Sequence, residues 1–139
     1  MWDDLVAATK AVVDTSTLIY EVFDYRRRTF DKYPACTISP ADTVDPLFAD
    51  TSRNQRTYVI AITVYQERLD QGDSNAERIL RQIADDLITK FDADPYLGNT
   101  IAGRGYAKPI PGAFIAPPDN GEYPDTIALQ IFLECVVIQ

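Results

Sequence analysis

The chain has no histidine among its 139 residues. Histidine is the usual general base of Ser-His-Asp and Cys-His catalysis and a frequent zinc ligand. Its absence excludes those catalytic arrangements and His-ligated zinc sites. Because the sequence also contains no cofactor fingerprint and no paired-carboxylate motif, we expect a protein that is not an enzyme, with no cofactor and no metal site.

Cysteines and long apolar runs are scarce as well. The two cysteines, Cys36 and Cys135, lie in apolar, strand-like contexts, which predicts two buried free thiols in a reducing cytosol. No apolar run is long enough to cross a bilayer, and the acidic start at residues 1–4 lacks the features of a signal peptide. We therefore expect a chain that stays in the cytoplasm of the cell that makes it, unless an assembly carries it elsewhere, and that has no membrane partner.

Basic residues are outnumbered. The chain carries 13 lysines and arginines against 21 acidic residues, a net charge of −8. Specific nucleic-acid binding needs clustered basic side chains that displace counterions. The run Arg26-Arg27-Arg28 is flanked by Asp24 and Asp31, so we interpret it as the solvated end of a helix. DNA is expected at most to slide past this acidic chain without being held.

The composition is otherwise that of an ordinary globular protein, with 46% hydrophobic and 24% charged residues. The length predicts one domain over residues 1–139. Its centre is a strand over residues 53–68, where β-branched and aromatic residues alternate, followed by a helix over residues 74–91 with one apolar stripe. Ser74 and Glu77 predict a capping box at the start of this helix.

The flanking segments complete the pattern. Residues 2–25 predict one helix, or two short helices broken at residues 14–17, and residues 33–39 predict a short strand. Residues 39–52 form the connection of a wide hairpin, and residues 96–108 are expected to be a mobile surface loop. An edge strand at 109–118 pairs with a long strand at 125–138. The order α-β-β-α-β-β predicts an α+β fold, with an antiparallel sheet of two hairpins and the helices packed on one face.

The two long strands carry apolar side chains on both faces, more than two helices can cover. A second sheet or a neighbouring subunit is expected to cover the rest, which indicates a homo-oligomer. The candidate subunit-interface residues are Tyr58, Val59, Tyr65, Phe132 and Val136.

Three short motifs carry a resemblance to a known family: Tyr33-Pro34 before a strand, Asn54-Gln-Arg56-Thr-Tyr58 entering a strand, and Ala76-Glu-Arg78 opening a helix. Over nearly the whole chain, their order resembles the bacteriophage tail terminator, or tail-to-head joining, family. The resemblance implies a structural virion protein of the tail–neck region. Family members form a hexameric ring on the finished tail tube, stop its polymerisation and join it to the head, and DNA passes through the ring. The implied partners are copies of the chain itself, the tail tube protein and a head-completion protein.

A ring of this kind needs contact loops above and below and a lumen that does not hold DNA. The candidate tail- or neck-contact residues are Asp45, Asp50, Tyr96, Arg104 and Tyr106. The candidate acidic lumen residues are Asp70, Asp73, Asp92 and Asp94. Phosphate groups would be repelled by such a lumen, and DNA would not stick.

Two other functions stay open at this point. The chain could be a head-side connector, a neck protein or another minor tail protein, because these small folds look alike in sequence. It could also be a cytosolic module that binds a peptide or small ligand at a sheet edge, for which the strand at 109–118 is the best support. A chain that stays monomeric at every concentration would favour the binding module.

Overall fold

The computed structural model describes residues 1–27, 29–43, 47–48, 54–68, 72–115 and 126–138. Two helices and six strands lie within them: α1 (Trp2–Val13), β1 (Glu21–Phe23), β2 (Ala35–Thr43), β3 (Leu47–Phe48), β4 (Asn54–Glu67), α2 (Asp73–Ala93), β5 (Gly105–Ile115) and β6 (Thr126–Ile138). The strands form one sheet in the order β1-β2-β4-β6-β5, and β3 pairs with the start of β4. The predicted α+β class is confirmed.

Both predicted hairpins are present. β2 pairs antiparallel with β4, and β5 pairs antiparallel with β6. The sheet is nevertheless mixed, because β1 lies parallel to β2 at the edge. The prediction of a wholly antiparallel sheet is wrong in this one pairing, since a three-residue strand is too short to show alternation in a sequence.

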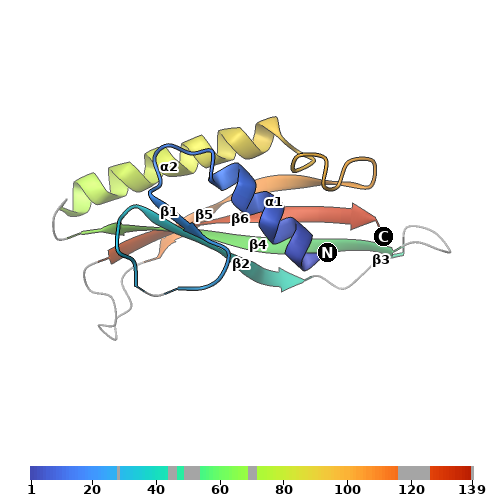
Figure 1. Ribbon diagram of the computed structural model, residues 1–139, viewed down its shortest axis with the longest axis horizontal. Coiled ribbons are helices and arrows are strands. Elements are labelled where there is room, and N and C mark those ends of the chain that lie inside the picture. Colours follow the sequence, from blue (N-terminus) through green and yellow to red (C-terminus); the bar gives the residue numbers. More distant parts are fainter. Residues whose placement is uncertain (28, 44–46, 49–53, 69–71, 116–125, 139) are drawn as a thin grey trace.

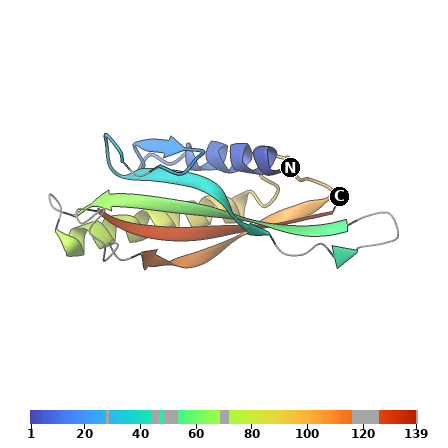
Figure 2. The ribbon, with the colours of Figure 1, turned by 90° about the horizontal axis from the view of Figure 1, so that it is seen from below.

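The helices cover one face of the sheet, and the core lies between the two layers. Alternate residues of β4 and β6 point to this side; Tyr58, Ile60, Ile62, Val64, Ile127, Leu129, Ile131, Leu133, Cys135 and Val137 are all buried there. The stripe of α2 packs on them through Ala76, Leu80, Ile83, Leu87 and Phe91. In Figure 1 α2 runs along the sheet, and in Figure 2 the strands pass in front of it. Neither of the two described helices lies on the opposite face.

The helix ends differ from the sequence prediction at two places. The N-cap of α2 is Gly72 with φ of 78°, and no side chain caps the helix, so the capping box at Ser74 is wrong. A glycine suits this position because φ is in the left-handed region. α1 is a single helix that ends at Val13, and the residues after it form a turn and then β1.

The turn after α1 is tied to α2. Ser16 is 6% exposed, and its hydroxyl donates a hydrogen bond to the Asp86 carboxylate at 2.8 Å. The Ser16 hydroxyl oxygen also accepts a bond from the Leu18 amide at 3.4 Å. The break that the sequence indicated at residues 14–17 therefore serves as a fixed corner between the helix and the sheet edge.

Replacing Ser16 with alanine is expected to lower the free energy of unfolding by about 1–2 kcal/mol, because a hydrogen bond to a charged group is lost at a partly buried site. Urea unfolding of Ser16→Ala, Asp86→Asn and the double variant measures the coupling between the two side chains. Thr17→Ala, at the exposed next position, is the control. Additive effects of the two substitutions would contradict the contact.

The two cysteines are free and buried, as predicted. Both lie on the helix-covered side of the sheet, Cys36 on β2 and Cys135 on β6. Burial raises the pKa of the Cys36 thiol strongly, and it raises the pKa of the Cys135 thiol to about 12. Both thiols are therefore protonated and unreactive at neutral pH.

Candidate functional site

The sheet face opposite α1 and α2, which we call the open face, has no described helix on it. Val59 on β4 and Phe132 and Val136 on β6 point to this side and are half-buried by their neighbours. On the same face Gln130 donates a hydrogen bond to the Thr63 hydroxyl at 3.3 Å. Three of the candidate interface residues thus lie together on this open face.

The other two interface candidates are placed differently. Tyr58 is 6% exposed and lies on the helix side, where its ring meets the edge of Trp2 at 4.8 Å between centroids. Tyr65 does lie on the open face, but its ring packs against the Phe30 ring, with 4.9 Å between the ring centroids. Tyr58 and Tyr65 lie on opposite faces of the sheet; α1 covers Tyr58, and the β1–β2 connection covers Tyr65.

An aromatic cluster covers the open face at its β1 and β2 edge. The ring centroid of Phe30 lies 5.8 Å from those of Phe23 and Tyr33. The guanidinium carbon of Arg27 lies 4.5 Å from the centroid of the Phe23 ring. Edge-on and tilted ring pairs at these distances are favourable. Arg26 and Arg27 are therefore not at the end of a helix, as the sequence predicted for this run, and Arg27 contributes to the packing of the β1–β2 connection.

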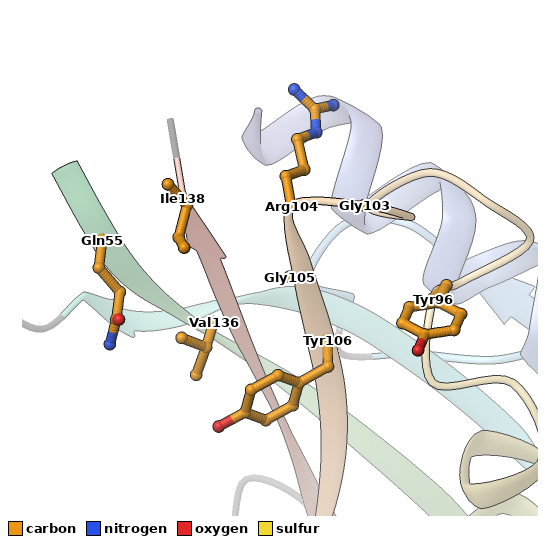
Figure 3. A pocket seen from close by; sticks show the side chains of 8 residues that line it. All are labelled: Gln55, Tyr96, Gly103, Arg104, Gly105, Tyr106, Val136 and Ile138. Atoms are coloured by element: carbon orange, nitrogen blue, oxygen red, sulfur yellow. The ribbon is translucent and has the colours of Figure 1, made fainter. Parts of the chain in front are cut away.

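A groove of about 420 Å³ opens at the far end of β5 and β6, near the chain termini (Figures 1 and 3). Its lining, which we call the β5 groove, consists of Gln55, Tyr96, Gly103, Arg104, Gly105, Tyr106, Val136 and Ile138. Tyr96 and Tyr106 are about half exposed. In Figure 3 the Tyr106 side chain extends over the sheet toward Val136, and Arg104 points away from the start of β5. Three candidate contact residues, Tyr96, Arg104 and Tyr106, are thus brought together, whereas Asp45 and Asp50 lie outside the described residues.

The loop that carries Tyr96 is packed against the core. Leu97 and Ile101 are buried at 2% and 0% exposure, and the Ala107 amide donates to the Pro95 carbonyl at 2.7 Å. β5 begins at Gly105, where an added Cβ would collide with the Val136 carbonyl oxygen. The expectation of a mobile surface loop over residues 96–108 is therefore wrong, because two apolar side chains fasten the loop and its last residues join the sheet.

The acidic lumen candidates do not gather at one place. Asp73 begins α2 and Asp92 lies exposed in its last turn, so about 28 Å of helix separates them. The Asp94 carboxylate accepts the Gly98 amide at 2.9 Å and closes the turn after α2. Asp70 lies outside the described residues. Whether any of these residues faces a lumen stays a prediction.

The outer edge of β5 offers few groups to an incoming strand. The Ile138 amide donates to the Arg104 carbonyl. With the register of the two strands, this means that the backbone amides and carbonyls of even-numbered β5 residues bond to β6, and those of odd-numbered residues point to the outer edge. Among the odd-numbered residues, the Ala107 amide is bonded to Pro95, and Pro109 and Pro111 have no amide hydrogen. Strand addition along residues 107–111 would therefore lack donors, which weighs against a peptide-binding module at this edge.

Exposed apolar side chains also occur at the opposite edge, beside β1. Leu18 is 43% exposed and Tyr20 is 71% exposed. From the sequence, neither residue had an expected role, because both fall near the end of a predicted first helical segment. Their position directly after the helix-breaking residues 14–17 is the sequence feature that could have marked them as lying outside the helix.

The described residues contain no group of three or more cysteine, aspartate or glutamate side chains placed to hold a metal ion. Neither of their two helices combines the length and hydropathy needed to cross a bilayer.

The described residues form an α+β fold with one sheet face that carries no described helix and a groove at the start of β5. The same fold occurs in a chain of a solved structure described as the virion of a native gene transfer agent (GTA) particle. The two chains superpose with a TM-score of 0.56 and 14% sequence identity, over 97% of this chain and 95% of that chain. No protein-family model matches the sequence, and no curated protein matches it. At 14% identity the likeness shows a common fold.

Proposed function

We propose that the chain is a structural protein of a phage-like virion, placed at the junction of tail and head. The observation that carries this proposal is the shared fold with a chain of a gene transfer agent virion, which extends over almost the full length of both chains. A partial overlap would fit a common substructure, whereas 97% and 95% coverage includes the helices, the sheet and the loops. A virion role is also consistent with a sheet that has no described helix on one of its faces.

The finer part of the proposal is that the chain is a tail terminator. Copies of it form a ring, with six as the expected number, which sits on the tail tube protein, stops tube growth and presents its other side to a head-completion protein. DNA passes through the ring without specific binding, in keeping with the net charge of −8. Support for this step comes from the sequence motifs at residues 33–34, 54–58 and 76–78 and from the open face that carries Val59, Phe132 and Val136. Assembly takes place in the host cytoplasm.

Electron microscopy of particles made without this gene tests the proposal. We expect overlong, irregular tail tubes that are not attached to heads, because nothing stops polymerisation. Supplying the intact gene in trans restores tails of normal length. Tails of normal length beside separate heads would instead assign the chain to the head side of the neck, and intact infectious particles would overturn the virion proposal.

A further inference from the structure

Three consecutive residues in the loop after α2 have positive φ angles. The values are 49° for Leu97, 62° for Gly98 and 72° for Asn99. Glycine adopts this left-handed region freely, whereas a residue with a Cβ meets steric contact with its own backbone there, and such residues normally occur singly. Leu97 is the least expected of the three, because a bulky side chain rarely takes this conformation. The turn at residues 97–99 therefore stores backbone strain, and other contacts must hold it.

Two kinds of contact hold this turn. The Asp94 carboxylate accepts the Gly98 amide with both of its oxygens, each at 2.9 Å, and we call this contact the clasp. A hydrogen bond to an ionised carboxylate is stronger than one between neutral groups. The side chains of Leu97 and Ile101, on either side of the turn, are buried in the hydrophobic core. The strained turn thus depends on one charged hydrogen bond and on two apolar side chains.

The two ends of the loop are fixed more firmly than its middle. The Ala107 amide donates to the Pro95 carbonyl at 2.7 Å, and the Ile138 amide donates to the Arg104 carbonyl at 2.7 Å. The backbone amides that donate to carbonyls within the loop do so at 3.2–3.3 Å, which is longer than the usual distance of about 2.9–3.0 Å. Opening of the loop would therefore be confined to residues 96–103, with Pro95 and Arg104 as fixed ends.

The loop builds one wall of the β5 groove. Tyr96, Gly103 and Arg104 line the groove from the loop, and Val136 and Ile138 line it from β6 (Figure 3). Tyr96 directly precedes the strained turn, so the direction in which its ring points follows from the backbone of the turn. The shape of the groove therefore depends on whether the turn keeps its left-handed conformation.

We propose that residues 94–104 form a two-state loop, in which the clasp between Asp94 and Gly98 controls whether the β5 groove is formed. In the clasped arrangement, which is the one in the structure, the turn is left-handed and the loop walls the groove. In the released arrangement, a minor and transient state of the native chain, the clasp is broken, the turn relaxes, and Leu97 and Ile101 leave the core while both ends of the loop stay in place. This device goes beyond the proposed virion role and does not depend on it.

Amide hydrogen exchange of the purified chain, followed residue by residue by NMR, tests the clasp. Asp94→Ala is expected to raise the exchange rates of the amides of residues 100–102 about tenfold or more, because a hydrogen bond to a charged group is lost. The amides of β4 and β6 are expected to keep their native rates, because the opening is local. Asp92→Ala removes an exposed carboxylate two residues earlier and is the matched control, with unchanged exchange in the loop.

Substitutions at Asn99 test the strain separately from the clasp. Glycine adopts a φ of 72° without steric cost, so Asn99→Gly is expected to slow the exchange of the same amides about two- to fivefold. Asn99→Ala is expected to speed their exchange by a similar factor, because alanine tolerates the left-handed region less well than asparagine. Asn99 is exposed, so the loss of a packed contact would not produce these opposite changes.

Relaxation dispersion of the Val136 and Ile138 methyl groups reports on the groove, because both side chains line it from β6. We expect it to increase in Asp94→Ala and to stay at its native level in Asp92→Ala. Native exchange rates in Asp94→Ala would overturn the clasp, and fast exchange that extends through β4 and β6 would overturn a local opening. Fast exchange in the loop with native methyl relaxation would overturn the link between the loop and the groove.

Discussion

Replacing Phe91 with alanine is expected to lower the free energy of unfolding by about 3–5 kcal/mol, the usual cost of truncating a buried phenylalanine. Phe91 is fully buried in the core at the last turns of α2, where the helix passes into the loop that carries Tyr96. Leu97 and Ile101, which hold the loop that carries Tyr96, belong to the same hydrophobic core as Phe91. Urea unfolding followed by circular dichroism measures the stability change.

Tyr96→Ala is the matched control, because it removes an aromatic ring only five residues away that is 48% exposed. Tyr96→Ala is expected to change the free energy of unfolding by no more than about 0.5 kcal/mol. If the two variants lost equal stability, the burial of Phe91 and the assignment of Tyr96 to a surface groove would both be contradicted.

Raising the pH above 9 is expected to destabilise the native state through the two buried thiols. Burial raises the folded-state pKa of Cys36 and Cys135 above the ordinary value of 9.0, for Cys135 to about 12. A raised acid pKa means that the folded chain keeps protons that the unfolded chain releases. The stabilisation of the thiols is therefore complete below pH 9 and is lost as the pH rises toward the folded pKa, by about 1.4 kcal/mol per pH unit for each thiol.

Denaturant unfolding between pH 8 and pH 11 measures this slope, and a chain with Cys36→Ala and Cys135→Ala is the control. The control loses some stability at every pH because small cavities form. Its pH dependence is expected to be flatter, since tyrosines and lysines titrate in both chains alike. Equal slopes in the two chains would show that the thiols are accessible to solvent in the folded state.

The long elements could be predicted because their periodicity extends over many residues. The alternation of β4 and β6 and the stripe of α2 indicated both the element boundaries and the residues that face the core. For the same reason, alternation alone was enough to predict the side of the sheet on which Val59, Phe132 and Val136 lie. Both hairpins followed from the turn residues between these elements.

The parts that could not be predicted depend on contacts between distant residues. β1 has only three residues, and its pairing with β2 defines it as a strand. Ser16 forms a hydrogen bond with Asp86, which lies seventy positions away in the sequence. Leu97 and Ile101 lie in a glycine-rich segment without a period, so nothing local marked them as buried. Tyr58 was a candidate interface residue, but it lies on the same face as Ile60 and Ile62, in the core, and its ring packs on Trp2 of α1.

The proline-bearing edge of β5 has a consequence for chains that accumulate in solution. Sheets with bare edges tend to join one another and to aggregate when a protein accumulates. In β5, Pro109 and Pro111 have no amide hydrogen to point outward, and the outward amide of Ala107 is already bonded to the Pro95 carbonyl. Two chains in solution therefore cannot join their sheets through backbone hydrogen bonds along this stretch. Chains at high concentration are therefore protected from fibre formation through this stretch of the sheet edge.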